Sequence, residues 1–241
     1  MKDVFGNYVI QKILEFGPAE HINALFETIQ GKLLEMAKHI YAWRVVQKFI
    51  EVLNLDKKRE ILNELEDDIL EWIYDLYGNH VVQKIIEKIP YTEIVFIQKH
   101  AEEQWKTLCM HTYGCRVIQR ILENWPVSWT DPIYNEIINN HVLELTKDQF
   151  GNYVIQLILE KGARSQDKRI ICTTLKGNVR ELSIHKYASN VVEKWIKNWE
   201  NEDKTILIEE LLGYSNESNN PTNSSLYQIM DNKYGNYVVQ K

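Results

Sequence analysis

Side chains able to hydrogen-bond and stack against a flat polar ring recur at regular intervals along this chain. The first set is Asn7, Tyr8 and Gln11, and a similar set returns six more times. In a helix, residues i and i+4 lie on one face, so Asn7 and Gln11 project side by side and together offer donors and acceptors. Tyr8 points about 100° away and can stack through its aromatic face. This combination suits a planar heterocycle such as a nucleobase.

Each set belongs to a seven-residue motif: an aromatic, a small residue, two variable residues, two β-branched residues, then Gln or Glu. The motifs start at Phe5, Tyr41, Tyr77, Tyr113, Phe150, Tyr187 and Tyr234. Their first variable residues, at 7, 43, 79, 115, 152, 189 and 236, are 36, 36, 36, 37, 37 and 47 residues apart. Self-similarity at this period is typical of repeat proteins in which every repeat is one small structural unit.

The elements that position the motif are predicted to be helices. A step of about 36 residues accommodates two or three helices with tight turns, and apolar residues between motifs, such as Ile22, Leu25 and Phe26, follow helical spacing. We therefore expect an all-α array over residues 1–241, in which each repeat buries its apolar face against its neighbours. The β-branched pair of each motif faces this core, and we also expect the opening aromatics and most tryptophans to be buried.

Two features interrupt the regular array. Residues 214–225 are polar and contain Pro221, which predicts a protruding loop, either a solvated insertion or a partner contact. The first motif starts near Met1 and the last stops at Gln240, without the polar capping repeats that such arrays need. The expectation is a fragment or truncated product that lacks both terminal caps.

Composition excludes several classes of protein. No apolar run approaches the roughly 20 residues of a membrane span, and no secretory signal is present. Three cysteines offer no disulfide framework, which predicts a reducing compartment. Cys109, His111 and Cys115 lack a clear fourth ligand, so no metal is expected. We find no nucleophile–base set and no Gly-rich phosphate loop, and therefore expect no enzyme activity.

The net charge is −6, yet cations follow the Gln or Glu of six motifs, with Leu157 as the exception. Stacked repeats should align them as a basic stripe beside the variable residues. Acidic residues three positions later, such as Glu51, either pair with these cations or face solvent. A basic stripe on an acidic body favours selective over non-specific binding of nucleic acid. The stripe consists of Lys12, Lys48, Lys84, Arg120, Lys194 and Lys241.

The motif sets Asn-Tyr-x-x-Gln, Asn-His-x-x-Gln, Cys-Arg-x-x-Gln and Ser-Asn-x-x-Glu resemble the recognition helices of the Pumilio-homology (PUF) domain. The resemblance covers nearly all of the chain, as family repeats two to eight. It implies a curved α-solenoid, a right-handed superhelix of about seven three-helix repeats, that binds single-stranded RNA with one base per repeat. It further implies a monomer without cofactor or metal.

The resemblance also implies a role for each variable residue. Base edges would be met by Asn7, Gln11, Gln47, Asn79, Gln83, Cys115, Gln119, Asn152, Gln156, Ser189, Glu193, Asn236 and Gln240. Bases would stack on Tyr8, Arg44, His80, Arg116, Tyr153, Asn190 and Tyr237. With RNA antiparallel to the protein, the implied target is 5′-UGUAUAU. Glu193, if not merely a variant of Gln, favours guanine because a carboxylate only accepts hydrogen bonds.

Trp43 departs from the family pattern, because adenine-binding repeats usually carry a small Cys or Ser there. Its indole would either push the base away from Gln47 or stack on it. The base bound by this repeat is therefore left open.

The family relationship implies a cytoplasmic protein that binds mRNA 3′ untranslated regions and represses translation or promotes decay. Its convex face and the 214–225 loop would contact deadenylation or repression machinery. Two alternatives are a protein-binding scaffold of the armadillo or HEAT kind and a PUF-related ribosome-assembly factor. A passive solvated surface is disfavoured, because it would not keep Gln or Glu at one position in seven copies.

Overall fold

The computed structural model describes residues 1–162, 164–198, 201–212 and 225–241. Within these ranges every regular element is a helix, and none is a strand. The helices form two compact units, Met1–Leu108 with Thr112–Thr130, and Cys109–His111 with Asp131–Lys241. The predicted all-α repeat organisation is thereby confirmed.

A repeat consists of a short helix, a helix that carries the motif, and a third helix. The first unit contains α1 (Gly6–Phe16), α2 (Ala19–Glu27), α3 (Leu33–Ala37), α4 (Trp43–Val52), α5 (Leu55–Leu65), η1 (Glu66–Asp68), α6 (Ile69–Tyr74), α7 (Gly78–Lys88), η2 (Tyr91–Glu93), α8 (Val95–Ala101) and α10 (Gly114–Asn124). Two helices include residues of both units, α9 (Trp105–Cys109) and α11 (Val127–Glu136).

The second unit continues the same order of helices. Its elements are η3 (Ile137–His141, a π-helix), α12 (Val142–Lys147), α13 (Gly151–Lys161), α14 (Ser165–Leu175), α15 (Val179–Ser183), α16 (Ala188–Asn198), α17 (Asn201–Leu212), α18 (Ser225–Met230) and α19 (Gly235–Val239). Of the predicted 214–225 loop, residues 214–224 lie outside the described residues, and Ser225 is the first residue of α18.

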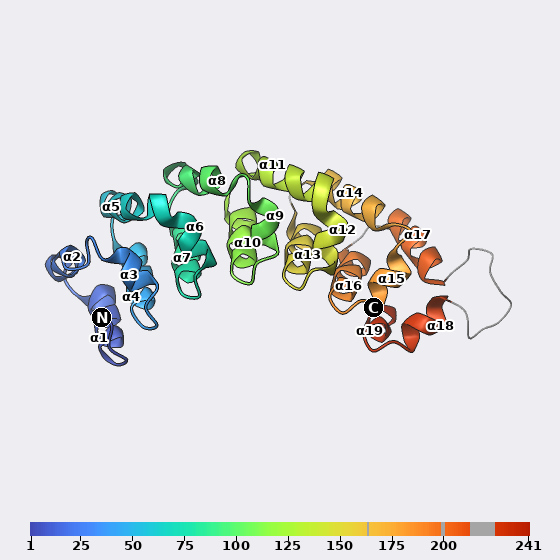
Figure 1. Cartoon of the computed structure of the whole chain (residues 1–241), viewed down its shortest axis with the longest axis horizontal. Coiled ribbons are helices and arrows are strands. Elements are labelled where there is room, and N and C mark those ends of the chain that lie inside the picture. Colours follow the sequence, from blue (N-terminus) through green and yellow to red (C-terminus); the bar gives the residue numbers. More distant parts are fainter. Residues whose placement is uncertain (163, 199–200, 213–224) are drawn as a thin grey trace. The chain divides into compact units, whose positions relative to one another are not determined.

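The seven motif helices are α1, α4, α7, α10, α13, α16 and α19. In the first unit α4 packs against α1 and α7, and α7 packs against α10; in the second, α16 packs against α13 and α19 (Figure 1). The β-branched residues make these contacts, since Val45, Val46, Val81 and Val82 are 0% exposed. Helical periodicity turns both residues of the pair inward in the five inner motifs, as the sequence predicts, whereas Val9 and Val239 of the first and last motifs are 59% and 38% exposed.

The small residue of the motif allows close packing at the start of the helix. A Cβ added to Gly78 would lie 2.8 Å from the Trp72 carbonyl oxygen, inside the normal contact distance. Ala42 and Ala188 hold the same position in other repeats and are 0% exposed. A larger side chain there would push the motif helix away from the short helix that precedes it.

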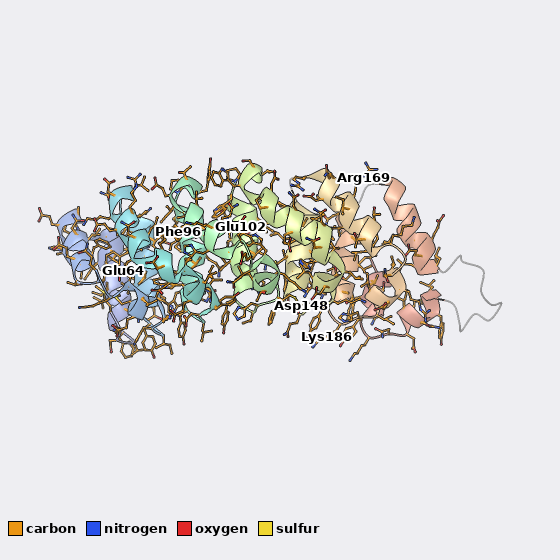
Figure 2. The ribbon with its side chains drawn as sticks, turned by 45° about the horizontal axis from the view of Figure 1, so that its top comes forward. Glu64, Phe96, Glu102, Asp148, Arg169 and Lys186 are labelled. Atoms are coloured by element: carbon orange, nitrogen blue, oxygen red, sulfur yellow. The ribbon has the colours of Figure 1, made fainter. Side chains whose placement is uncertain are left out.

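A carboxylate also ties the first and third helices of one repeat together in the first unit. Glu64 of α5, labelled in Figure 2, accepts hydrogen bonds from the N–H groups of Gly31 (2.9 Å) and Leu33 (2.7 Å). Gly31 has φ 72°, a left-handed conformation that glycine adopts without a steric penalty. This contact fixes the turn before α3 against α5.

The prediction for the opening aromatics was wrong. None of the seven is buried, and Phe5 is 76% exposed. In six motifs the aromatic residue directly precedes the first helical residue, so its ring lies at the helix start, where neighbouring helices cover it only partly. The tryptophan prediction is confirmed, because Trp72, Trp105, Trp125 and Trp195 are buried.

Candidate nucleic-acid interface

In four motif helices an Asn holds the following Gln in place. Asn79 is 1% exposed and donates both amide hydrogens to backbone carbonyls, to Asp75 and Leu76 at 2.9 Å each. Its Oδ1 accepts a hydrogen bond from Gln83 Nε2 at 2.9 Å. The same Gln-to-Asn bond joins Gln11 to Asn7 (3.0 Å), Gln156 to Asn152 (2.8 Å) and Gln240 to Asn236 (3.3 Å).

The Asn and Gln amides therefore have different roles. The Asn amide hydrogens are committed to the helix start, so Asn acts mainly through the Gln that it orients. Gln83 is only partly buried and keeps its Oε1 and one N–H for another molecule. The i and i+4 side chains lie together as helix geometry predicts, but the exposed hydrogen-bonding groups belong to Gln.

The repeats without Asn use other contacts. Cys115 is 1% exposed and lies 3.6 Å from the carbonyl oxygen of Thr112, while Gln119 Nε2 donates to the Cys115 carbonyl at 3.0 Å. Ser189 is 4% exposed, and one carboxylate oxygen of Glu193 lies 3.6 Å from Lys241 Nζ. The Ser189 repeat thus presents an acceptor-only carboxylate where the others present an amide.

Most of the second variable residues are exposed on the motif helices. Tyr8, Tyr153 and Tyr237 are 60%, 44% and 57% exposed. His80, Arg116 and Asn190 are exposed as well, whereas Arg44 is partly buried. Rings and a guanidinium plane that face outward are suited to stacking on bases.

The motif helix that starts at Trp43 has a different surface. The Arg44 guanidinium carbon lies 4.5 Å from the Trp43 ring, and the His80 ring lies 4.7 Å away at an interplanar angle of 21°. Gln47 Nε2 donates to the His80 backbone carbonyl at 2.6 Å. Desolvation of the imidazole by its neighbours, together with the charge of Arg44, lowers the pKa of His80. In this repeat, the residues that the family resemblance assigns to base binding contact one another.

Sequence reasoning missed a capping residue two positions before the opening aromatic. Asp75 Oδ1 accepts from the N–H groups of Tyr77 (2.8 Å) and Gly78 (2.7 Å), two donors that the helix itself leaves unpaired. The sequence contained a signal for this role, because a side chain that can accept hydrogen bonds recurs two residues before the opening aromatic. Bonds of this kind are made by Asp3, His39, Asp75, Asp148 (labelled in Figure 2), His185 and Asn232.

We expect Asp75→Ala to lower the free energy of unfolding by about 1 kcal/mol, because two N–H groups at the start of α7 lose their acceptor. Urea denaturation measures the change. Asp68→Ala is the control, since Asp68 precedes α6 without making a side-chain cap. Equal effects of the two substitutions would contradict a capping role for Asp75.

The cations that follow the motifs alternate with acidic side chains, and their alignment as one basic stripe stays a prediction. In the first unit, Lys84 lies 3.1 Å from Glu51 and 3.3 Å from Glu87, so it bridges two repeats. We call this row the Lys–Glu ladder; it consists of Lys12, Glu15, Lys48, Glu51, Lys84, Glu87, Arg120 and Glu123. In the second unit Lys194 pairs with Glu160 at 2.6 Å. Of the two possibilities for the acidic residues, pairing with cations is the one observed.

The ladder should make stability depend on pH. Burial raises the pKa of Glu51, but hydrogen bonds from Lys84 and Lys48 outweigh it, so the pKa of this carboxyl lies below its ordinary value. The hydrogen bond from Lys12 likewise lowers the pKa of Glu15. A carboxyl with a lowered folded-state pKa stabilises the fold above its unfolded pKa, and this contribution disappears as pH falls through the folded value.

We therefore expect urea midpoints to fall as the pH is lowered from about 6 to about 3, and Glu51→Gln to show a smaller fall than the unsubstituted chain. Glu102→Gln is a matched control, because this carboxyl lies exposed at the end of α8 (Figure 2). An unchanged pH dependence in Glu51→Gln would show that the ladder does not contribute.

Other kinds of site find no support in the described residues. No group of three or more His, Cys, Asp or Glu side chains among them could hold a metal ion. The three cysteines are buried, and none of them forms a disulfide. None of the described helices combines the length and apolarity required to cross a lipid bilayer.

Comparison with solved structures finds close matches over nearly the whole chain. The Puf3 RNA-binding domain bound to a Cox17 RNA 3′ UTR recognition sequence (site A) superposes with a TM-score of 0.91 at 37% identity, covering 99% of this chain and 71% of that one. PUF-8 in complex with PBE-RNA gives 0.89 at 35% identity, covering 99% and 68%.

Curated relatives match over shorter segments. Pumilio homolog 12 of Arabidopsis thaliana is 38% identical over 108 residues, which are 45% of this chain and 16% of that protein. Pumilio homology domain family member 4 of Saccharomyces cerevisiae is 39% identical over 100 residues, 40% of this chain and 10% of that protein. The matched segments are thus a small part of these relatives' length.

The family model of the Pumilio-family RNA-binding repeat matches seven segments, residues 1–29, 32–66, 68–98, 104–138, 141–173, 178–212 and 226–241. Each segment contains one complete motif helix. The motif spacing, the helical repeats and the amide pairs described above all coincide with these segments. The chain belongs to the Pumilio family of RNA-binding repeat proteins.

Proposed function

We propose that this chain binds single-stranded mRNA sequence-specifically, with one base per repeat, at 5′-UGUAUAU elements in 3′ untranslated regions. The observation that carries the proposal is the Gln that Asn holds in four motif helices, next to a partly or fully exposed stacking residue. A fixed amide with a free acceptor and a free donor matches the mixed edge of uracil. The similar Puf3 and PUF-8 domains hold bound RNA in their solved structures, which supports the same conclusion.

The assignment of bases follows the side chains of each repeat. Asn236, Asn152, Asn79 and Asn7, each with its Gln, take uracil at positions one, three, five and seven. Ser189 and Glu193 take guanine at position two, because a carboxylate accepts from the two donors on the guanine edge. Cys115 and Gln119 take adenine at position four, since the short Cys115 leaves room for a purine. The repeat that contains Trp43 corresponds to the base at position six.

The proposal includes an effect of binding on the bound mRNA. A chain that occupies 3′ untranslated elements in the cytoplasm would repress translation or promote decay by recruiting other proteins. We propose the surface away from the motif helices, together with residues 214–225, as the place of those protein contacts.

The experiment is a fluorescence-anisotropy titration with 5′-UGUAUAUA and with the same RNA carrying ACA in place of UGU, at one salt concentration. We expect a preference of at least about a hundredfold for the first RNA, because three mismatched bases each cost about 1–3 kcal/mol. Equal affinities in a folded sample would reject sequence-specific binding and favour a protein-binding scaffold.

Gln156→Ala should weaken binding to 5′-UGUAUAUA by about 1–3 kcal/mol, because the repeat of Asn152 loses its base-edge amide. Gln166→Ala is the matched control, since Gln166 is exposed on α14 in the same unit. Anisotropy titration of both variants measures the difference. An affinity of Gln156→Ala equal to that of the control would remove this repeat from the base assignment.

A further inference from the structure

The side chain of Trp43 contacts the stacking residues of two successive repeats. Arg44, from its own repeat, lies over the indole at 4.5 Å, and His80, from the next repeat, stacks on it at 4.7 Å with an interplanar angle of 21°. Both distances are typical of stacked aromatic and cation–π contacts. A flat heteroaromatic ring in contact with the stacking residues of two repeats makes the contacts expected of a bound nucleobase.

No other motif places a ring at this position. The first variable residue is Asn, Cys or Ser in the remaining six copies, and these short side chains stay at the start of their helices. The Trp43 ring nitrogen is buried without a hydrogen-bond partner among the described residues. Stacking, rather than a hydrogen bond through this nitrogen, therefore holds the indole.

The hydrogen-bonding residue of this repeat is engaged as well. Gln47 Nε2 donates to the His80 backbone carbonyl at 2.6 Å, whereas Gln83 and Gln156 donate to the Asn of their own repeat. Trp43 offers no acceptor that could turn Gln47 back toward its own helix. Because of this, the group expected to identify the base is directed toward the next repeat.

We propose that Trp43 takes the place of a nucleobase against Arg44 and His80, so that this repeat spans one nucleotide without selecting its base. The RNA recognised is then 5′-UGUAUNU, in which N is any base and is excluded from the stack. This inference rests on the proposed function, since it presupposes that the other six repeats bind RNA. It makes Trp43 the residue that determines the breadth of specificity at the sixth position.

The first test needs no variant. Affinities of the unsubstituted chain are measured by anisotropy for four RNAs of sequence 5′-UGUAUNUA, with N as A, C, G or U. We expect all four to agree within about threefold, against a loss of about tenfold or more when position four is changed from A. A preference for adenine at position six as large as that at position four would overturn the proposal.

The position of the sixth base can be observed directly. RNA with 2-aminopurine at position six should stay bright when bound, because an excluded base is unstacked, whereas 2-aminopurine at position four should be quenched by stacking. Quenching at position six equal to that at position four would also overturn the proposal.

A substitution tests the cause. Trp43→Cys gives this repeat the side-chain set that Cys115, Arg116 and Gln119 supply in another, so it should gain a preference of about tenfold for adenine at position six. A folded Trp43→Cys variant, checked by its thermal transition, that still binds all four RNAs alike would show that Trp43 is not the cause. If RNAs with UGU and with ACA bind alike in every protein, the proposed function itself fails, and the two failures are thereby distinguished.

Discussion

A chain carrying both Ser189→Asn and Glu193→Gln should bind RNA with uracil at the second position more tightly than RNA with guanine there. The physical reason is the exchange of acceptor-only oxygens for an amide that both donates and accepts. In the substituted repeat, the new amide at 193 can donate to the new amide at 189, as Gln83 donates to Asn79 at 2.9 Å. Each correctly paired base contributes about 1–3 kcal/mol to discrimination. The unsubstituted chain should therefore prefer guanine by about tenfold or more, and the double variant should prefer uracil by a similar factor.

The measurement is a pair of anisotropy titrations, with 5′-UGUAUAUA and 5′-UUUAUAUA, on the double variant and on the unsubstituted chain. Glu193→Gln also removes the contact with Lys241, so urea denaturation must show that the second unit stays folded. Position five is the internal control, because Asn79 and Gln83 are unchanged and its discrimination should persist. Retention of guanine preference by a folded double variant would refute the assignment of this repeat.

Trp72→Ala should reduce the stability of the first unit by about 3–5 kcal/mol, the usual loss when a buried large aromatic side chain is removed. Trp72 is 0% exposed in α6, which packs against α7. Gly78 lies close to the Trp72 backbone, because a Cβ added to Gly78 would lie 3.1 Å from the Trp72 Cα. The cavity left by the indole would therefore lie directly beneath the start of the helix that carries Asn79 and Gln83.

Urea denaturation with tryptophan-independent detection, such as circular dichroism, measures this loss. Trp129→Ala is a matched control, because Trp129 is only partly buried and contacts Tyr91 in a tilted arrangement with ring centroids 5.3 Å apart. Its loss should cost about 1 kcal/mol. Comparable costs for the two substitutions would mean that Trp72 does not form the core beneath α7.

Much of the fold follows from patterns within a few residues. The β-branched pair, the small residue before the variable pair and the Gln or Glu four residues later each have a fixed direction on one helix turn. For this reason the spacing predicted the motif helices and their buried faces, and it placed Asn79 beside Gln83. The capping position of Asp75 was equally readable, because an acceptor recurs there in nearly every repeat, but its role needed the positions of the backbone N–H groups.

The tertiary structure decided what depends on neighbouring repeats. Lys84 pairs with Glu51, 33 residues earlier, and no local pattern distinguishes that pairing from exposure to solvent. The opening aromatics are only partly covered, because their burial depends on how adjacent helices meet. The same holds for Trp43, whose identity is plain in the sequence. Its place against Arg44 and His80 is set by the separation and angle of α4 and α7, which result from the packing of the apolar faces of both helices.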